Sequence, residues 1–229
     1  MRLVSALIAV YNAEQFLREA IESVVHQSYQ PVEVILVDDG STDGTPQIAR
    51  SYSQVHYFHQ SNLGVAAARN AALAHASGEF VALLDADDVW TLDKLEIQIE
   101  YLNQTSEVDV VFAHEKFFSE QEMEKPSWIR DEIWNESHPA YVPSTLVTRK
   151  TVFEKIGNFD LNYKTSPETE WLFRAKDMGI KIEVVPKVLL LRRIHNQNVS
   201  HIPQKQMMDR MRTLRASVKR QKSRNLEKI

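Results

Sequence analysis

Residues 3–12 read LVSALIAVYN, residues 32–41 read VEVILVDDGS and residues 80–88 read FVALLDADD. Each segment is a short apolar run that ends in polar side chains, and stretches with a helical spacing of apolar residues separate the three. Continuous apolar strands that alternate with helices are typical of a parallel sheet covered on both faces. We therefore expect an α/β fold with a mostly parallel central sheet.

The polar residues that follow these strands are expected to share one crevice, because ligands of an open parallel sheet bind beyond the carboxyl ends of its strands. Close packing of several carboxylates is unfavourable unless a cation compensates, and carboxylate oxygens favour Mg²⁺, Mn²⁺ or Ca²⁺. A cation that also binds a phosphate would let an acidic crevice accept an anionic ligand. The competing interpretation is a solvated turn and helix cap at 85–88. The crevice would hold one aromatic ring and five carboxylates, from Tyr11, Asp38, Asp39, Asp85, Asp87 and Asp88.

Composition and missing motifs exclude several classes of protein. The 229 residues are 43% hydrophobic and 25% charged, which is ordinary for a globular protein, and no apolar run approaches the ~20 residues that span a bilayer. The absence of cysteine excludes a disulfide scaffold, a thiol nucleophile and a thiolate zinc site. The chain has no G-x-x-x-x-G-K-[ST], no G-x-G-x-x-G after the first strand and no G-x-S-x-G, which argues against a P-loop nucleotidase, a dinucleotide oxidoreductase and a serine hydrolase.

The net charge of −4 hides a strong asymmetry. Residues 203–229 contain nine Lys or Arg and only two Asp or Glu, so the rest of the chain is acidic and not suited to binding nucleic acid. In this basic tail, Met207, Met211, Leu214 and Val218 share one helical face. The pattern fits a helix on anionic lipid, and it fits equally well a helix that packs on its own acidic body or on a second subunit.

Three longer stretches carry a resemblance to a known family. They are residues 8–29 (IAVYNAEQFLREAIESVVHQSY), 32–45 (VEVILVDDGSTDGT) and 62–88 (NLGVAAARNAALAHASGEFVALLDADD). Together they resemble the nucleotide-sugar half of family 2 glycosyltransferases of the GT-A fold. Residues 157–160 (GNFD), 169–180 (TEWLFRAKDMGI) and 192–200 (RRIHNQNVS) are also similar to this family, and the resemblance is weak through residues 118–139.

The resemblance implies a nucleotide-diphosphosugar transferase architecture with helices on both faces of the sheet. It divides the chain into a nucleotide-sugar-binding half at 1–105, an acceptor-binding half of the same domain at 106–202 and the basic helical tail at 203–229. We expect a cytoplasmic protein, with the inner face of the membrane as an alternative location. Besides packing on the chain's own body, a homodimer and a peripheral membrane contact are the expected uses of the tail.

The implied activity is transfer of a sugar, with inversion, from a nucleoside diphosphate sugar, usually a UDP sugar, to an acceptor hydroxyl. The absence of Q-x-x-R-W argues against a processive synthase, so one sugar per event is expected. The acceptor is left open among a glycan, a lipid-linked saccharide, a peptide and a small molecule. The alternative function is a non-catalytic sugar-nucleotide-binding subunit of a glycan-assembly complex.

The resemblance also implies roles for individual residues that bind the nucleotide sugar. Tyr11 would lie against the base, and Asp39 would hydrogen-bond to the polar edge of that base. Arg69 would sit near the base or the diphosphate as a charge-assisted donor, and Asp85 near the ribose. Arg193, with its neighbour Arg192, would contact phosphates.

Metal ligands and a general base complete the implied site. A divalent cation, Mn²⁺ or Mg²⁺, would be held by Asp87 or Asp88, with His195 near the metal or the diphosphate; the alternative for His195 is an ordinary polar loop residue. Glu168 takes the position where the family usually has the aspartate of a Glu-Asp pair, which makes it the candidate base. Its alternative is a helix-capping glutamate that follows Ser166 and Pro167.

Overall fold

The computed structural model describes residues 1–119, 125–126, 129–196, 198 and 203–226, with side chains described from 207 to 224 in the last helix. Over these residues the strands form one nine-stranded sheet in the order β3-β2-β1-β4-β8-β6-β9-β5, with β7 paired to β6. The pairs β1/β2, β1/β4, β2/β3 and β6/β9 are parallel. The pairs β4/β8, β5/β9, β6/β7 and β6/β8 are antiparallel but shorter, so the sheet is mostly parallel, as predicted.

The element bounds follow the apolar pattern of the chain. The strands are β1 (Val4–Val10), β2 (Val32–Asp38), β3 (Val55–His59), β4 (Phe80–Asp85), β5 (Val89–Trp90), β6 (Val110–Ser119), β7 (His138–Ala140), β8 (Val147–Arg149) and β9 (Ile182–Ile194). The helices are α1 (Leu17–Val25), α2 (Thr45–Arg50), α3 (Val65–His75), α4 (Lys94–Gln104), α5 (Asp131–Asn135), the 3-10 turn η1 (Pro143–Thr145), α6 (Lys150–Ile156), α7 (Pro167–Asp177) and α8 (Pro203–Leu226).

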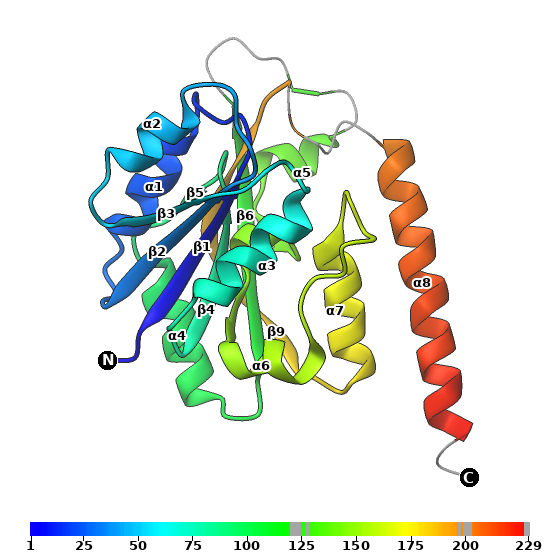
Figure 1. The fold of residues 1–229 in the computed structure, drawn as a ribbon. Coiled ribbons are helices and arrows are strands. Elements are labelled where there is room, and N and C mark those ends of the chain that lie inside the picture. Colours follow the sequence, from blue (N-terminus) through cyan, green and yellow to red (C-terminus); the bar gives the residue numbers. More distant parts are fainter. Residues whose placement is uncertain (120–124, 127–128, 197, 199–202, 227–229) are drawn as a thin grey trace.

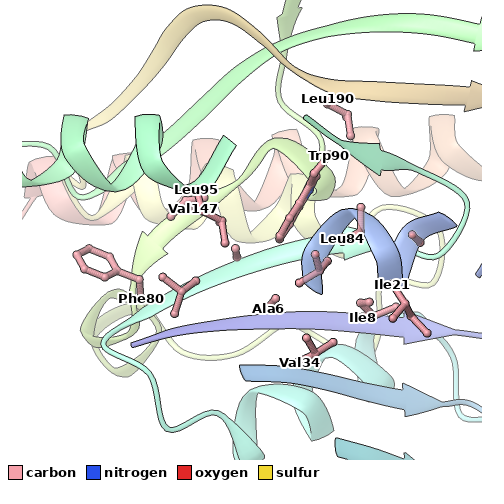
Figure 2. Packing of buried hydrophobic residues seen from close by; sticks show 14 of the residues in the cluster. Ala6, Ile8, Ile21, Val34, Phe80, Leu84, Trp90, Leu95, Val147 and Leu190 are labelled. Atoms are coloured by element: carbon pink, nitrogen blue, oxygen red, sulfur yellow. The ribbon is translucent and has the colours of Figure 1, made fainter. Parts of the chain in front are cut away.

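Helices cover both faces of the sheet, and two apolar cores result (Figure 1). One core packs α1, α2 and α4 on the sheet, and Figure 2 shows how Ile8 of β1, Leu84 of β4 and Trp90 of β5 meet there. The second core packs α3, α6 and α7 on the opposite face. Alternate residues of β1 enter the two cores, as expected for a strand that is buried on both sides.

The second half of the chain departs from the predicted element bounds. The apolar runs 182–185 and 188–191 on either side of Pro186 predict two short strands, but the structure has one strand, β9, which runs through the proline. It has register shifts against β6 at Ala113–Glu115. Proline lacks an N–H donor, and strands tolerate it at such irregularities. Residues 118–139 contain two tryptophans, several acids and two prolines, which predicts a long loop or insertion. The structure has α5 and the start of β7 there, whereas 120–124 and 127–128 lie outside the described residues.

The basic tail forms the long helix α8, which lies against α7 at the outer edge of the molecule (Figure 1). Ion pairs join the two helices, because Arg220 contacts Asp177 at 2.7 Å and Glu170 at 3.3 Å. Packing on the chain's own acidic body is therefore one use of the tail. Within the described ranges, no helix is both long and apolar enough to cross a bilayer.

Candidate functional site

The carboxyl ends of β1, β2 and β4 open into one cleft of about 710 Å³, which α7, β9 and the start of α8 close from the other side. Eight of the nine predicted site residues line it. They are Tyr11, Asp39, Arg69, Asp85, Asp87, Asp88, Glu168 and His195. The parallel strand order brings these residues together, since it places three strand ends at one edge of the sheet.

The nucleotide side of the cleft is built at the ends of β1 and β2. The Tyr11 side chain is half exposed to the cleft, so it is not a core residue at a strand end. Asp39 is buried and accepts hydrogen bonds from the backbone N–H groups of Leu63 (2.9 Å) and Gly64 (2.8 Å) and from the amide of Gln60 (2.7 Å). A carboxylate offers about four acceptor positions, so one stays available for a ligand donor.

Asp38 does not reach the cleft, and the expectation of five strand-end carboxylates in one crevice is wrong in this respect. Its buried side chain accepts hydrogen bonds from Tyr57 Oη (2.7 Å) and the Ser41 N–H (2.8 Å). Burial opposes ionisation, but the hydrogen bonds from Ser41 and Tyr57 outweigh it and lower the pKa of Asp38. Consecutive strand residues point to opposite faces, so Asp38 and Asp39 cannot both face the ligand.

Arg69 joins two carboxylates from distant parts of the chain. Its buried guanidinium contacts Asp85 at 2.7 Å and Glu168 at 3.0 Å. Burial disfavours its charge, but these two carboxylates outweigh burial and raise the pKa of Arg69. Burial also raises the pKa of Glu168, although Arg69 partly opposes this shift. Glu168 lies in the first turn of α7 after Ser166 and Pro167, and its carboxylate faces the cleft.

The two other acids at the end of β4 have different surroundings. Asp87 Oδ2 lies 3.0 Å from His195 Nε2 and accepts a hydrogen bond from the Asn198 amide at 3.1 Å. Asp88 is buried, and its two oxygens accept hydrogen bonds from Ser144 Oγ (2.6 Å) and the Arg193 N–H (3.2 Å). Burial, together with the charge of Asp87, raises the pKa of Asp88 well above its usual range.

The distance between Asp87 Oδ2 and His195 Nε2, 3.0 Å, fits two ligands of one metal ion. Two neighbouring ligand atoms of an octahedral ion, each about 2.1 Å from it, lie about 3 Å apart. Over the described ranges, no three His, Asp or Glu side chains cluster closely enough to hold an ion by themselves. Mg²⁺ is commonly bound through one or two carboxylates together with substrate phosphates. The described residues therefore fit a cation that a bound diphosphate would help to coordinate.

Arg193 is the predicted site residue that the structure keeps out of the cleft. Its buried side chain donates to the Asp87 carbonyl at 3.1 Å, contacts Glu19 at 2.8 Å and stacks on the ring of Phe118 at 4.5 Å. Arg192, the neighbouring residue of β9, lines the cleft instead. Alternation along the strand explains the exchange.

Sequence reasoning missed two residues that position the acids. Ser144 in η1 donates to Asp88 and accepts from the Asp85 N–H at 3.1 Å, and Trp90 Nε1 donates to the Ser144 carbonyl at 2.8 Å. Asn198 holds Asp87 and also accepts from the His195 N–H at 2.7 Å. No local motif marks Ser144, which lies 56 residues from Asp88 in the chain.

Comparison with known proteins gives concordant matches. The family model described as "Glycosyl transferase family 2" matches residues 5–180. An uncharacterized glycosyltransferase of Rickettsia typhi is 30% identical over 211 residues, which cover 87% of this chain and 66% of that protein. The chain spans less than two thirds of the curated relatives that it matches here, and only 19% of two further Rickettsia glycosyltransferases.

Two solved structures share the fold. S. aureus TarS in complex with UDP has a TM-score of 0.72 at 22% identity, over 95% of this chain and 65% of that chain. The mannosyltransferase PcManGT from Pyrobaculum calidifontis, in complex with GDP-Man and Mn²⁺, has a TM-score of 0.73 at 19% identity, over 94% of this chain and 64% of that chain. Similarity at this level of identity establishes the GT-A type of α/β fold.

Proposed function

This chain belongs to glycosyl transferase family 2, and from that premise we propose that it transfers one sugar from a UDP sugar to an acceptor hydroxyl, with inversion. The observation that carries the proposal is the convergence of Arg69, Asp85 and Glu168 in the same cleft as Asp87 and His195. Structural neighbours bound to UDP and to GDP-Man support a nucleotide sugar as the donor class. We further propose 1–105 as the donor half, 106–202 as the acceptor half and 203–229 as the tail.

The nucleotide would occupy the side of the cleft formed by β1 and β2. Stacking on a base is worth about 1–3 kcal/mol in proteins that bind single strands, and half-exposed Tyr11 offers such a ring. The remaining acceptor position of Asp39 would take an N–H from the base. Asp85 would accept from the ribose, and Arg192 at the cleft wall would contact phosphate, which leaves Arg193 out of the role that was expected of both arginines.

Asp87 and His195 are the proposed ligands of a divalent cation, Mn²⁺ or Mg²⁺. When bound there, such a cation would supply positive charge to the leaving diphosphate. Asp88 is less suited to this role, because both of its oxygens already accept hydrogen bonds and its pKa is raised. We assign Asp88 to positioning: through Ser144 and the Arg193 N–H it fixes the chain on which Asp87 and His195 lie.

Glu168 is the proposed general base. The acceptor oxygen would form a bond to the anomeric carbon while the bond from that carbon to the diphosphate breaks, and the proton of the acceptor hydroxyl would pass to Glu168. Attack opposite the leaving group inverts the anomeric centre. Arg69 opposes the effect of burial on the pKa of this half-buried carboxylate and so favours the ionised form that a base needs.

A thermal-shift screen against nucleotide diphosphates and their sugars, with and without Mn²⁺, tests the donor class. At a hundred times Kd, a ligand stabilises the native state by ~2.7 kcal/mol, which raises the Tm of a domain of this size by several degrees. We expect the largest shift with UDP or a UDP sugar in the presence of Mn²⁺. ATP with Mn²⁺ is the control, and an equal shift with ATP would contradict the assignment.

The pH dependence of turnover follows from the raised pKa of Glu168. A general base works only when deprotonated, so kcat should fall as the pH drops through this pKa. The acid limb of the kcat profile is therefore expected above pH 4.5, the ordinary value for a glutamate. Binding of UDP, measured over the same pH range, is the control. A profile that stays flat down to pH 4.5 in folded protein would exclude Glu168 as the base.

A further inference from the structure

The long helix α8 presents one face that the other described residues leave uncovered. Met207, Met211, Leu214 and Val218 are spaced by four, three and four residues and form an apolar stripe, and each of them is 47–61% exposed. Met208 beside the stripe is 75% exposed. An α-helix has 3.6 residues per turn, so this spacing places the four side chains on a single face.

The opposite side of α8 is fixed to the body of the protein. Asp209 accepts hydrogen bonds from the Thr165 N–H (3.0 Å) and hydroxyl (2.7 Å), and Ser217 and Arg220 contact Asp177 at 2.8 and 2.7 Å. Thr213 and Ser217 are buried there. The orientation of the helix is thus set by its polar contacts, and the apolar stripe points away from them.

A row of cations runs beside the stripe. Arg215, Lys219 and Lys222 are exposed and repeat the spacing of four and three residues, and within the described part of the chain none of them forms an ion pair. Between 207 and 224 the single acid is Asp209, which is engaged on the packed side. The uncovered face therefore combines apolar side chains with positive charge and carries no negative charge.

We propose that this face of α8, formed by the stripe Met207–Met211–Leu214–Val218 and the cations Arg215, Lys219 and Lys222, binds the surface of an anionic lipid bilayer. An amphipathic helix with a basic polar face lies in the plane of such a surface. Each Lys or Arg near anionic headgroups strengthens the attraction, and the apolar side chains enter the boundary between headgroups and acyl chains.

Charge favours a lipid surface over a second copy of the helix. A parallel pair of α8 helices would place these cations near their counterparts, where like charges are unfavourable, and in either orientation the uncovered face between 207 and 224 offers no acidic side chain to neutralise them. The acidic body is no obstacle to an anionic surface, because a helix is about 10 Å thick and the Debye length is about 8–10 Å at physiological salt. As the outermost element, α8 thus holds the acidic body about one Debye length away (Figure 1).

The face also lies next to the cleft. Arg210, one residue before Met211 on the adjacent side of α8, lines the cleft that contains Glu168. The loop that leads to Glu168 is joined to α8 by the Asp209–Thr165 hydrogen bonds and by Arg212, which stacks on the Tyr163 ring at 5.0 Å. A bilayer bound to this face would therefore lie beside the cleft mouth.

Vesicle co-sedimentation of the full chain tests the proposal. We expect binding to phosphatidylglycerol–phosphatidylcholine vesicles that is at least about tenfold tighter than binding to phosphatidylcholine alone and that weakens with added salt. Two variants should each bind the anionic vesicles about tenfold or more weakly than the wild type does. One is Leu214→Glu with Val218→Glu, which removes the apolar contact, and the other is Arg215→Glu with Lys219→Glu and Lys222→Glu, which reverses the cations.

The matched control is Arg50→Glu with Lys116→Glu and Lys155→Glu, which reverses three exposed cations outside α8 and should leave binding nearly unchanged. All the substituted side chains are exposed, and circular dichroism melting verifies that each variant folds. Equal binding to the two kinds of vesicle, or equal losses in the α8 and control variants, would overturn the proposal. A second result would also overturn it: the wild type does not bind vesicles but forms a dimer in sedimentation analysis, and Leu214→Glu abolishes that dimer. This result would assign the face to a second copy of the chain.

Discussion

Replacement of Glu168 by Gln is expected to lower kcat by about 10²–10⁴-fold, the usual contribution of a general base, while UDP binds as in the wild type. Gln has nearly the same size and can still accept a hydrogen bond from Arg69, but it cannot take up a proton. The loss should thus be confined to the chemical step. The measurement is multi-turnover release of UDP with an acceptor, with calorimetry for the affinity of UDP.

Two further variants make the Glu168 result specific. Glu168→Asp keeps a carboxylate and should retain more activity than Glu168→Gln, although the shorter side chain alters its reach to the acceptor. Glu154→Gln, on the exposed side of α6, is the control and should be as active as the wild type. If Glu168→Gln turns over at the wild-type rate, Glu168 is not the general base. Wild-type protein that binds UDP but never turns over would favour the non-catalytic sugar-nucleotide-binding subunit.

Asp87→Ala is expected to weaken Mn²⁺-dependent binding of UDP by about 10–100-fold or more. Loss of a group that only orients a metal ligand typically lowers the affinity for the metal about 10–100-fold. Asp87 is proposed as a ligand itself, so its loss should have at least this effect. In the wild type, chelation of Mn²⁺ should weaken UDP binding by a similar factor, whereas the variant should respond little to chelation. Calorimetry with UDP, with Mn²⁺ or with a chelator, measures both effects.

The comparison with Asp131→Ala and Asp88→Asn sharpens this result. Asp131 is 78% exposed on α5 and does not line the cleft, so its loss should leave binding unchanged. Asp88→Asn keeps the shape of the buried side chain, and we expect it to affect the metal dependence less than Asp87→Ala does. If Asp87→Ala keeps the full Mn²⁺-dependent affinity for UDP, Asp87 is not a metal ligand. If Asp88→Asn weakens this affinity more than Asp87→Ala does, Asp88 is the ligand instead.

The first half of the fold was predictable because its signals are local. An apolar run of five to seven residues between helical patterns identifies a buried strand, and β1, β2 and β4 lie where such runs predicted them. The second half was less predictable. The short strands β5, β7 and β8 carry too few residues for a periodic signal, and β9 runs through a proline that reads as a strand boundary.

The sequence by itself determined the family, the parallel sheet and the strand ends at which the polar residues gather, because each of these follows from patterns a few residues long. Only the tertiary structure decided which of two neighbouring side chains reaches the cleft. Asp39 lines it and Asp38 does not, and Arg192 lines it and Arg193 does not. A strand that is apolar on both faces does not reveal which face meets the ligand. Arg69 and Glu168, 99 residues apart in the chain, likewise meet only because the packing of α3 and α7 on one face of the sheet brings them within 3.0 Å.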